Sequence, residues 1–286
     1  MADRYTYLPY VGLSLVIGQT AVRLAQDGRA LLRGVLSVAF LAGLIAFSVI
    51  AYGRVAIWQN DETLFTDIID FNPIGSAYIN RATYYQDHYA GKVYSNDPAK
   101  KAEYLRKAIA DYEAVLRAPL TESYRFRVYY CLGTAWFDVG DYRAAARSLD
   151  EAIRIDSSRA RAFFVRGCAR GFLRDYTGAL ADFDRVLATS PRDAVTWFNK
   201  GTIKSQMGDD AGAVADFGRA MEIDPNYADA YFNRGAARYR LGDHRGALAD
   251  FDKVVELAPQ NAVAAKNRDV IQALVNTTSP TGRTSK

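Results

Sequence analysis

A motif that returns every 34 residues limits what this chain can fold into more than any other feature. Four segments of similar sequence follow one another, and a glycine holds the same place in each: Gly133, Gly167, Gly201 and Gly235. A fixed period of this length is typical of folds built by stacking one small unit, because each unit buries its apolar face against its neighbours. We therefore expect residues 126–261 to form a solenoid.

Other residues keep step with these glycines. An aromatic precedes each by four residues, an alanine follows by twelve, and a large apolar residue comes one turn later; in the first repeat these are Tyr129, Ala145 and Leu149. Small residues let two helices approach closely, and large ones fill the remaining space. Proline ends the second helix in three repeats, and Asp156-Ser157 takes its place in the first.

This pattern resembles the tetratricopeptide-repeat family. The resemblance implies an all-α fold in which each repeat is a pair of helices, A and B, and successive pairs stack into a right-handed solenoid. The repeat boundaries that we expect are 126–159, 160–193, 194–227 and 228–261.

Weaker patterns flank the four repeats. Residues 55–125 predict a connecting helix followed by a degenerate repeat, with an insertion at 91–100 between its two helices. Residues 262–276 predict a capping helix that shields the last apolar face, and residues 277–286 predict a polar, disordered tail.

The N-terminal region, residues 1–54, has the composition of a membrane anchor. Residues 34–53 form 20 consecutive uncharged positions and residues 5–22 form another 18, lengths that suit a bilayer core of roughly 30 Å. We predict two transmembrane helices, at about 5–22 and 34–53. The alternatives are a signal peptide at the N-terminus, which would need a basic start and a small-residue cleavage site, and buried soluble helices.

The loop between the two predicted spans carries Arg23, Arg29 and Arg33 against a single acid, Asp27. The positive-inside rule places such a loop in the cytoplasm. Both flanks would then lie outside, so the predicted location is an integral membrane protein with its repeats in the periplasm or a lumen.

Charge and cysteine content exclude several functions. The net charge is +4 with both signs interspersed, which is not the footprint of a nucleic-acid-binding protein. Two cysteines and two histidines are too few and too scattered for a zinc site or a disulfide framework. We predict no metal and no cofactor.

The candidate site is the face of helix A that lines the concave side of such a solenoid. Two series of side chains recur on it at the 34-residue period. The aromatic ladder consists of Tyr130, Phe164, Phe198 and Phe232, and the amide ladder consists of Asn80, Asn199, Asn233 and Asn267.

A carboxamide both donates and accepts, so the amide ladder is suited to the backbone of an extended peptide. The family resemblance adds that some of its members use asparagine at this position in that way. Cys131 and Val165 interrupt the ladder. Alternatively, the asparagines bond helix carbonyls or face solvent, and the aromatics pack between repeats.

Acidic and basic residues also recur, and we expect each repeat to pair them internally: Asp111, Asp182, Asp216 and Asp250 on helix B with Arg81, Arg166, Lys200 and Arg234 on helix A. Recurrence in every unit indicates architecture, whereas a catalytic acid would occur once, beside a base. We predict that the chain is not an enzyme on its own.

The segments MADRYTYLPYVGL and WQNDETLFTDIIDFNP, together with the repeats, resemble the C-terminal part of the transmembrane-and-tetratricopeptide-repeat protein O-mannosyltransferases. The chain lacks the upstream spans and the loop where that family's catalytic acids are expected. Three functions stay open: a membrane-anchored scaffold that binds protein or peptide, a subunit whose repeats recruit acceptor protein to a catalytic membrane glycosyltransferase, and an assembly platform without a ligand groove.

Overall fold

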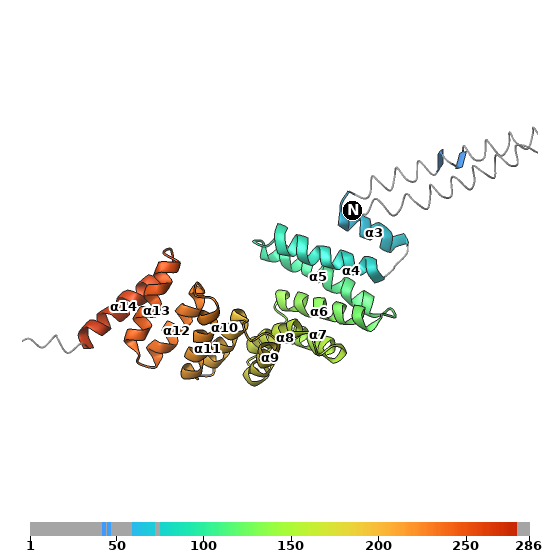
Figure 1. The fold of residues 1–286 in the computed structure, drawn as a ribbon. Coiled ribbons are helices and arrows are strands. Elements are labelled where there is room, and N and C mark those ends of the chain that lie inside the picture. Colours follow the sequence, from blue (N-terminus) through green and yellow to red (C-terminus); the bar gives the residue numbers. More distant parts are fainter. Residues whose placement is uncertain (1–41, 44, 47–58, 72–74, 279–286) are drawn as a thin grey trace, which may run out of the picture. The chain divides into compact units, whose positions relative to one another are not determined.

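The computed structural model describes residues 42–43, 45–46, 59–71 and 75–278, and all the regular structure in these ranges is helical (Figure 1). The chain divides into two compact units, Met1–Asn72 and Pro73–Lys286. In the first unit, α3 spans Asp61–Phe71. Asn60 begins this helix by accepting a hydrogen bond at Oδ1 from the Thr63 amide at 3.0 Å, which satisfies one of the free amides of the first turn.

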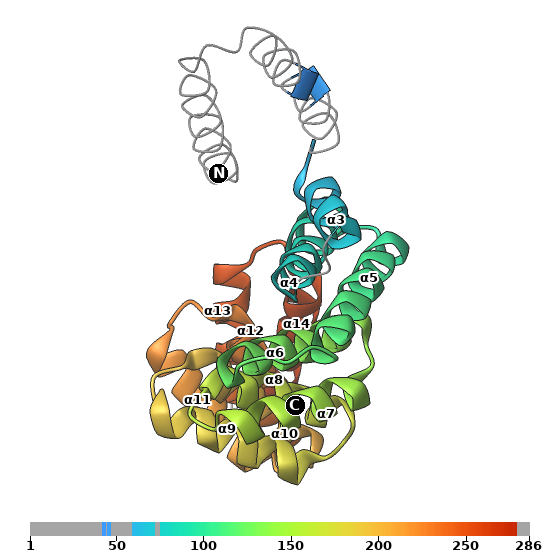
Figure 2. The same cartoon turned by 90° about the vertical axis from the view of Figure 1, so that its right-hand side faces the viewer.

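The second unit is a row of helices, each packed on the next along the chain. Figure 1 shows them in chain order, and Figure 2, turned by 90°, shows the later pairs behind the earlier ones. Their bounds are α4 Gly75–Tyr84, η2 Tyr85–Val93, α5 Pro98–Leu116, α6 Glu122–Val139, α7 Tyr142–Ile155, α8 Ala160–Phe172, α9 Tyr176–Thr189, α10 Ala194–Gln206, α11 Asp210–Ile223, α12 Ala228–Arg240, α13 His244–Leu257 and α14 Ala262–Thr278.

The predicted all-α repeat fold is confirmed in this unit. Helices α6, α8, α10 and α12 are the A helices of the four repeats, and α7, α9, α11 and α13 are their B partners. The recurring glycine of each A helix faces the large apolar residue of its B helix. A Cβ added at Gly133 would lie 2.6 Å from Leu149 Cγ, and one at Gly167 would lie 2.8 Å from Phe183 Cε1. Only glycine permits this separation of A and B.

The turns between A and B are built alike. An aspartate caps each B helix by accepting a hydrogen bond from an amide three residues on, as Asp141 does from Ala144 at 2.9 Å. The residue before that aspartate has positive φ and is glycine in three repeats, Gly140, Gly208 and Gly242. In the second repeat Arg174 occupies this position, at φ 61°.

The insertion predicted at 91–100 in the degenerate repeat lies partly within helices. Its first residues belong to η2, a π-helix that continues α4 as far as Val93, and its last belong to α5, which begins at Pro98 behind an Asp97 cap. Tyrosine rings hold the extended pair together, with Tyr89 and Tyr104 stacked at 4.2 Å. The aromatic side chains of 84–104 therefore bury each other where a regular repeat would simply turn.

Neighbouring A helices contact one another directly, α6 with α8, α8 with α10 and α10 with α12, whereas the B helices contact each other less. The A helices therefore lie on the inner side of the stack. The capping helix α14 buries Ala264 and Ile271 against α13. It continues to Thr278, two residues past the end that we expected.

No helix within residues 59–71 and 75–278, or in the short described pieces before them, is long and apolar enough to span a bilayer. The predicted span at 5–22 lies outside the described residues. So does the span at 34–53, apart from Ala42, Gly43, Ile45 and Ala46, and so does the tail from residue 279. The membrane region and its orientation stay predictions.

Candidate functional site

Three members of the aromatic ladder pack on the B helix of their own repeat. The ring of Phe164 lies 6.0 Å from that of Phe183, Phe198 lies 5.7 Å from Phe217, and Phe232 lies 5.4 Å from Phe251. These rings are half-buried, so one part of each contributes to the core and another part faces outward. These contacts lie within single repeats, whereas the alternative named above was packing between repeats.

Tyr130 has a different environment. Its ring lies parallel to that of Phe126, with centroids 6.2 Å apart, on the first turns of α6. Burial raises the pKa of Tyr130, and the nearby positive charge of Arg161 offsets part of that rise. Tyr130 therefore stays a neutral phenol that presents a hydroxyl beside a cation.

The amide ladder divides by hydrogen bonding. Asn199 Nδ2 donates to the carbonyl of Val195 one turn earlier, at 2.8 Å. This agrees with the alternative that the asparagines bond helix carbonyls. Asn80 is exposed on α4, while Asn233 and Asn267 are half-buried on α12 and α14. Within the described residues, no side-chain hydrogen bond fixes any of these three carboxamides, so their donors and acceptors can serve another molecule.

The sequence analysis did not predict a polar network beside Cys131, one of the two residues that interrupt the amide ladder. Tyr112 OH donates to Gln86 Oε1 at 3.3 Å, and Gln86 Nε2 donates to Thr134 Oγ1 at 3.1 Å. Cys131 lies against the same hydroxyl, and burial raises the pKa of its thiol. These residues link the degenerate repeat to α6. The only signal in the sequence was Cys131, which stands where other repeats have asparagine.

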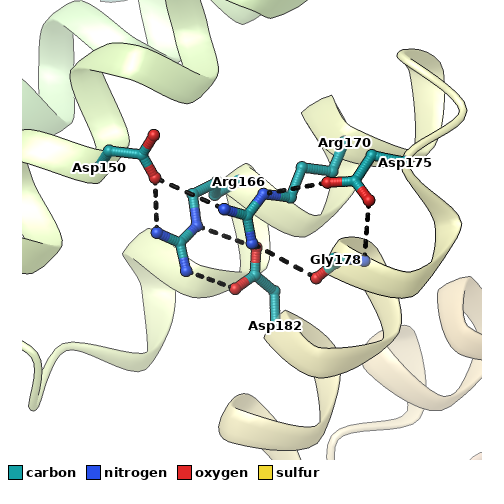
Figure 3. A network of polar contacts seen from close by, with 6 residues as sticks. All are labelled: Asp150, Arg166, Arg170, Asp175, Gly178 and Asp182. Atoms are coloured by element: carbon teal, nitrogen blue, oxygen red, sulfur yellow. Dashed lines mark hydrogen bonds and ion pairs between the residues drawn. The ribbon is translucent and has the colours of Figure 1, made fainter.

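Charged side chains join α7, α8 and α9 (Figure 3). Asp182 is 2% exposed and accepts hydrogen bonds from Arg166 Nε at 3.0 Å and Arg170 Nη1 at 2.9 Å. Arg166 Nη1 also reaches Asp150 of the preceding repeat at 2.6 Å. Such a buried carboxylate needs these partners, because an unpaired charge there would be strongly destabilising.

The expected pairing within repeats is confirmed for Arg81–Asp111, Arg166–Asp182 and Arg234–Asp250. It is wrong for the third repeat. Lys200 Nζ reaches back to Asp184 at 2.6 Å, and Lys204 takes its place beside Asp216 at 2.7 Å. An arginine fork can contact two carboxylates at once, whereas a lysine ammonium is a point charge. In this repeat two lysines therefore pair with one carboxylate each.

The described residues hold no cluster of three His, Cys, Asp or Glu side chains arranged to bind a metal ion. The recurring aspartates are neutralised by arginine or lysine in ion pairs that tie helices together. The arrangement can therefore present amides and aromatic rings to a ligand. Nothing on these A helices brings a general acid and a general base together around an open site.

Family models agree with the repeats. Residues 130–194 and 228–261 match models described as tetratricopeptide repeat, and residues 201–242 match one described as TPR repeat. The chain therefore contains tetratricopeptide repeats. None of these matches supports the resemblance to the O-mannosyltransferase family, and the comparison with curated proteins found no significant match.

Solved structures share the fold. YrrB, described as a TPR protein with an unusual peptide-binding site, is 23% identical and covers 72% of this chain and 97% of its own, with a TM-score of 0.55. MamA is 22% identical over 60% of this chain and 96% of that chain, with a TM-score of 0.53. MamA 41-end from Desulfovibrio magneticus RS-1 is 21% identical over 63% and 97%, with a TM-score of 0.50.

Proposed function

We propose that this chain is a scaffold that binds an extended polypeptide segment along the inner face of its repeats. The observation that carries the proposal is the pair Asn233 and Asn267, which hold equivalent places on α12 and α14 and have carboxamides without a hydrogen bond to the described residues. A carboxamide matches the donor and acceptor of a peptide unit, so a series of them binds backbone without selecting sequence.

The aromatic ladder supports the same proposal. Its half-buried rings lie one residue before the amide positions on the same helices, which places apolar surface beside the amides. Apolar surface next to hydrogen-bonding groups is the usual composition of a peptide-binding surface. YrrB, which shares the fold, is itself described as having a peptide-binding site.

The proposal includes the predicted anchor: the scaffold is held at a membrane by residues 5–22 and 34–53, with the repeats on the extracytoplasmic side. Two measurements test this part. We expect the full chain to resist extraction from membranes by alkaline carbonate, and the repeats to be digested by protease added to the extracytoplasmic side of sealed vesicles. Release by carbonate would contradict the anchor, and protection from the protease would contradict the orientation. The described residues give no support to the glycosyltransferase-subunit alternative, which we do not propose.

Cross-linking from two positions tests the binding face. Benzoylphenylalanine is placed at Asn233 on α12 or, as the matched control, at Ala215, an exposed residue of α11. The full chain in mild detergent is irradiated with a pool of random dodecapeptides that have amidated C-termini. We expect peptide adducts from position 233 and few from position 215. Binding with adducts from position 215 alone would place the site elsewhere, and a pool without any bound peptide would contradict the function.

A further inference from the structure

Another series of residues shares the inner face of the A helices. These positions lie three residues before the aromatic ladder and four before the amide ladder, so they stand one turn earlier on the same side of each helix. From α6 to α14 the series reads Arg127, Arg161, Val195, Asp229 and Val263. Its charge therefore changes along the stack, from positive on the first two A helices to apolar and negative on the later ones.

Arg127 and Arg161 differ from the arginines that build the repeats. Arg166 and Arg234 are mostly buried and held in ion pairs with Asp182 and Asp250. Arg127 and Arg161 are exposed, and no carboxylate within residues 59–71 or 75–278 forms an ion pair with either. Their positive charges are therefore not neutralised by ion pairs within the described residues.

The two guanidinium groups lie beside the candidate site. Arg161 is close enough to Tyr130 to oppose the burial that raises the pKa of that phenol, and Arg127 acts in the same way on the Cys131 thiol. Tyr130 and Cys131 are the first-repeat members of the two positions that carry the aromatic and amide ladders. Asp87 also acts on the Cys131 thiol and raises its pKa, but within the described residues it forms no ion pair with Arg127.

Apolar surface accompanies these cations. The rings of Phe126 and Tyr130 are parallel, and Arg159 lies 5.6 Å from the centroid of Phe126. A shallow pocket of about 200 Å³ opens beside Phe126, between Glu122 and Arg159. Arg159 is paired with Asp156 at 2.8 Å, so it adds no free positive charge beside Arg127 and Arg161.

We propose that Arg127 and Arg161 select a polypeptide segment bearing Asp or Glu side chains, and that they orient it with its acidic part over α6 and α8 and its remainder over the amides of α12 and α14. Charge complementarity is the basis, because unpaired cations on a binding face attract carboxylates and repel basic segments. Asp229 on α12 favours the same orientation by repelling carboxylates from the other end. This inference rests on the proposed function.

The test uses the full chain in mild detergent and the amidated dodecapeptide pool, in which every carboxylate belongs to a side chain. Bound peptides are sequenced for the wild-type chain, for the double variant Arg127→Gln/Arg161→Gln, and for the control Arg143→Gln/Arg147→Gln. The control removes the same charge from exposed positions on α7. We expect Asp and Glu to be enriched by the wild type and the control and not by the double variant.

The affinity of one enriched acidic peptide should fall roughly tenfold in the double variant and remain within about twofold in the control, since each exposed pair contributes modestly. Raising the salt concentration should weaken wild-type binding by screening. Peptides bound without an acidic preference, or an acidic preference that survives in the double variant, would overturn this inference and leave the proposed function standing. A pool from which nothing binds would overturn both.

Discussion

At the scale of single residues, Arg174 departs from its own repeat pattern. It holds φ 61° at the turn between α8 and α9, where the other three repeats place glycine. A left-handed backbone costs a residue with a Cβ roughly 1–2 kcal/mol, whereas glycine adopts it freely. The second repeat therefore contains a small strain that the others avoid.

Replacing Arg174 by glycine should remove that strain. Because glycine also makes the unfolded chain more flexible, we expect a net gain in the free energy of unfolding of only about 0.5 kcal/mol. The reverse change, Gly242→Arg, should lose about 1 kcal/mol. Urea unfolding followed by circular dichroism measures both free energies of unfolding. If the two substitutions changed this free energy equally and in the same direction, the strain at Arg174 would be contradicted.

Single residues also show which features the sequence could predict and which it could not. The 34-residue period gave the helix pairs and the contact of Gly167 with Phe183, because both follow from repeated local pattern. The shift of Lys200 from Asp216 to Asp184 did not, since it depends on which carboxylate of two repeats a lysine can reach. The positions of the candidate site follow from the repeat period and stay a prediction, whereas the hydrogen bond that occupies Asn199 required coordinates.

At the scale of helix pairs, the recurring glycines set how closely A and B approach. Gly167→Ala would place a Cβ 2.8 Å from Phe183 Cε1 and 3.2 Å from Asp182 Cβ. Overpacking of this kind costs about 1–3 kcal/mol, which exceeds the gain in helix propensity from alanine of roughly 0.5–1 kcal/mol. We expect a net loss of about 1–2 kcal/mol in urea unfolding.

Gly218 of α11 provides the matched control. It is also inside a helix, but the nearest atom to an added Cβ is Arg234 Nη1 at 3.8 Å, an ordinary contact. Gly218→Ala should therefore stabilise the chain by roughly 0.5–1 kcal/mol. If both glycine-to-alanine changes stabilise, the close approach of helices A and B does not require glycine.

Gly218 also marks a gap in the ion pairs that connect successive repeats. The equivalent residue is Asp184 one repeat earlier and Asp150 two repeats earlier. Each forms an ion pair with the following A helix, Asp184 with Lys200 and Asp150 with Arg166. Gly218→Asp should complete the series by pairing with Arg234 Nη1. Relative to Gly218→Asn, we expect a further gain of about 0.5–1 kcal/mol that shrinks at high salt. Equal stability of the Asp and Asn variants at low salt would show that no pair forms.

At the scale of the whole stack, each unit depends chiefly on its neighbours. The hydrophobic clusters are local: one joins the degenerate repeat to α6, and another joins α13 to α14 through Phe251, Val254 and Ile271. A linear array of this kind loses stability at its ends first, because a terminal unit has one interface where an internal unit has two. Stability in this unit should therefore vary along the chain.

Removing α14 tests that expectation. Deleting residues 262–286 would expose Phe251 and Val254, which are about 1% exposed in the intact chain. Amide hydrogen exchange should accelerate strongly in α12 and α13 and change little in α6 and α7, since those helices keep both interfaces. The milder change Ile271→Ala, which costs about 2–4 kcal/mol at its own site, should give the same gradient. Deleting residues 279–286 alone, the matched control, should leave exchange in α12 and α13 unchanged, because the contacts of α14 with α13 are kept. Uniform acceleration from α6 to α13 would mean that the repeats unfold as one cooperative domain, and the linear description would have to be abandoned.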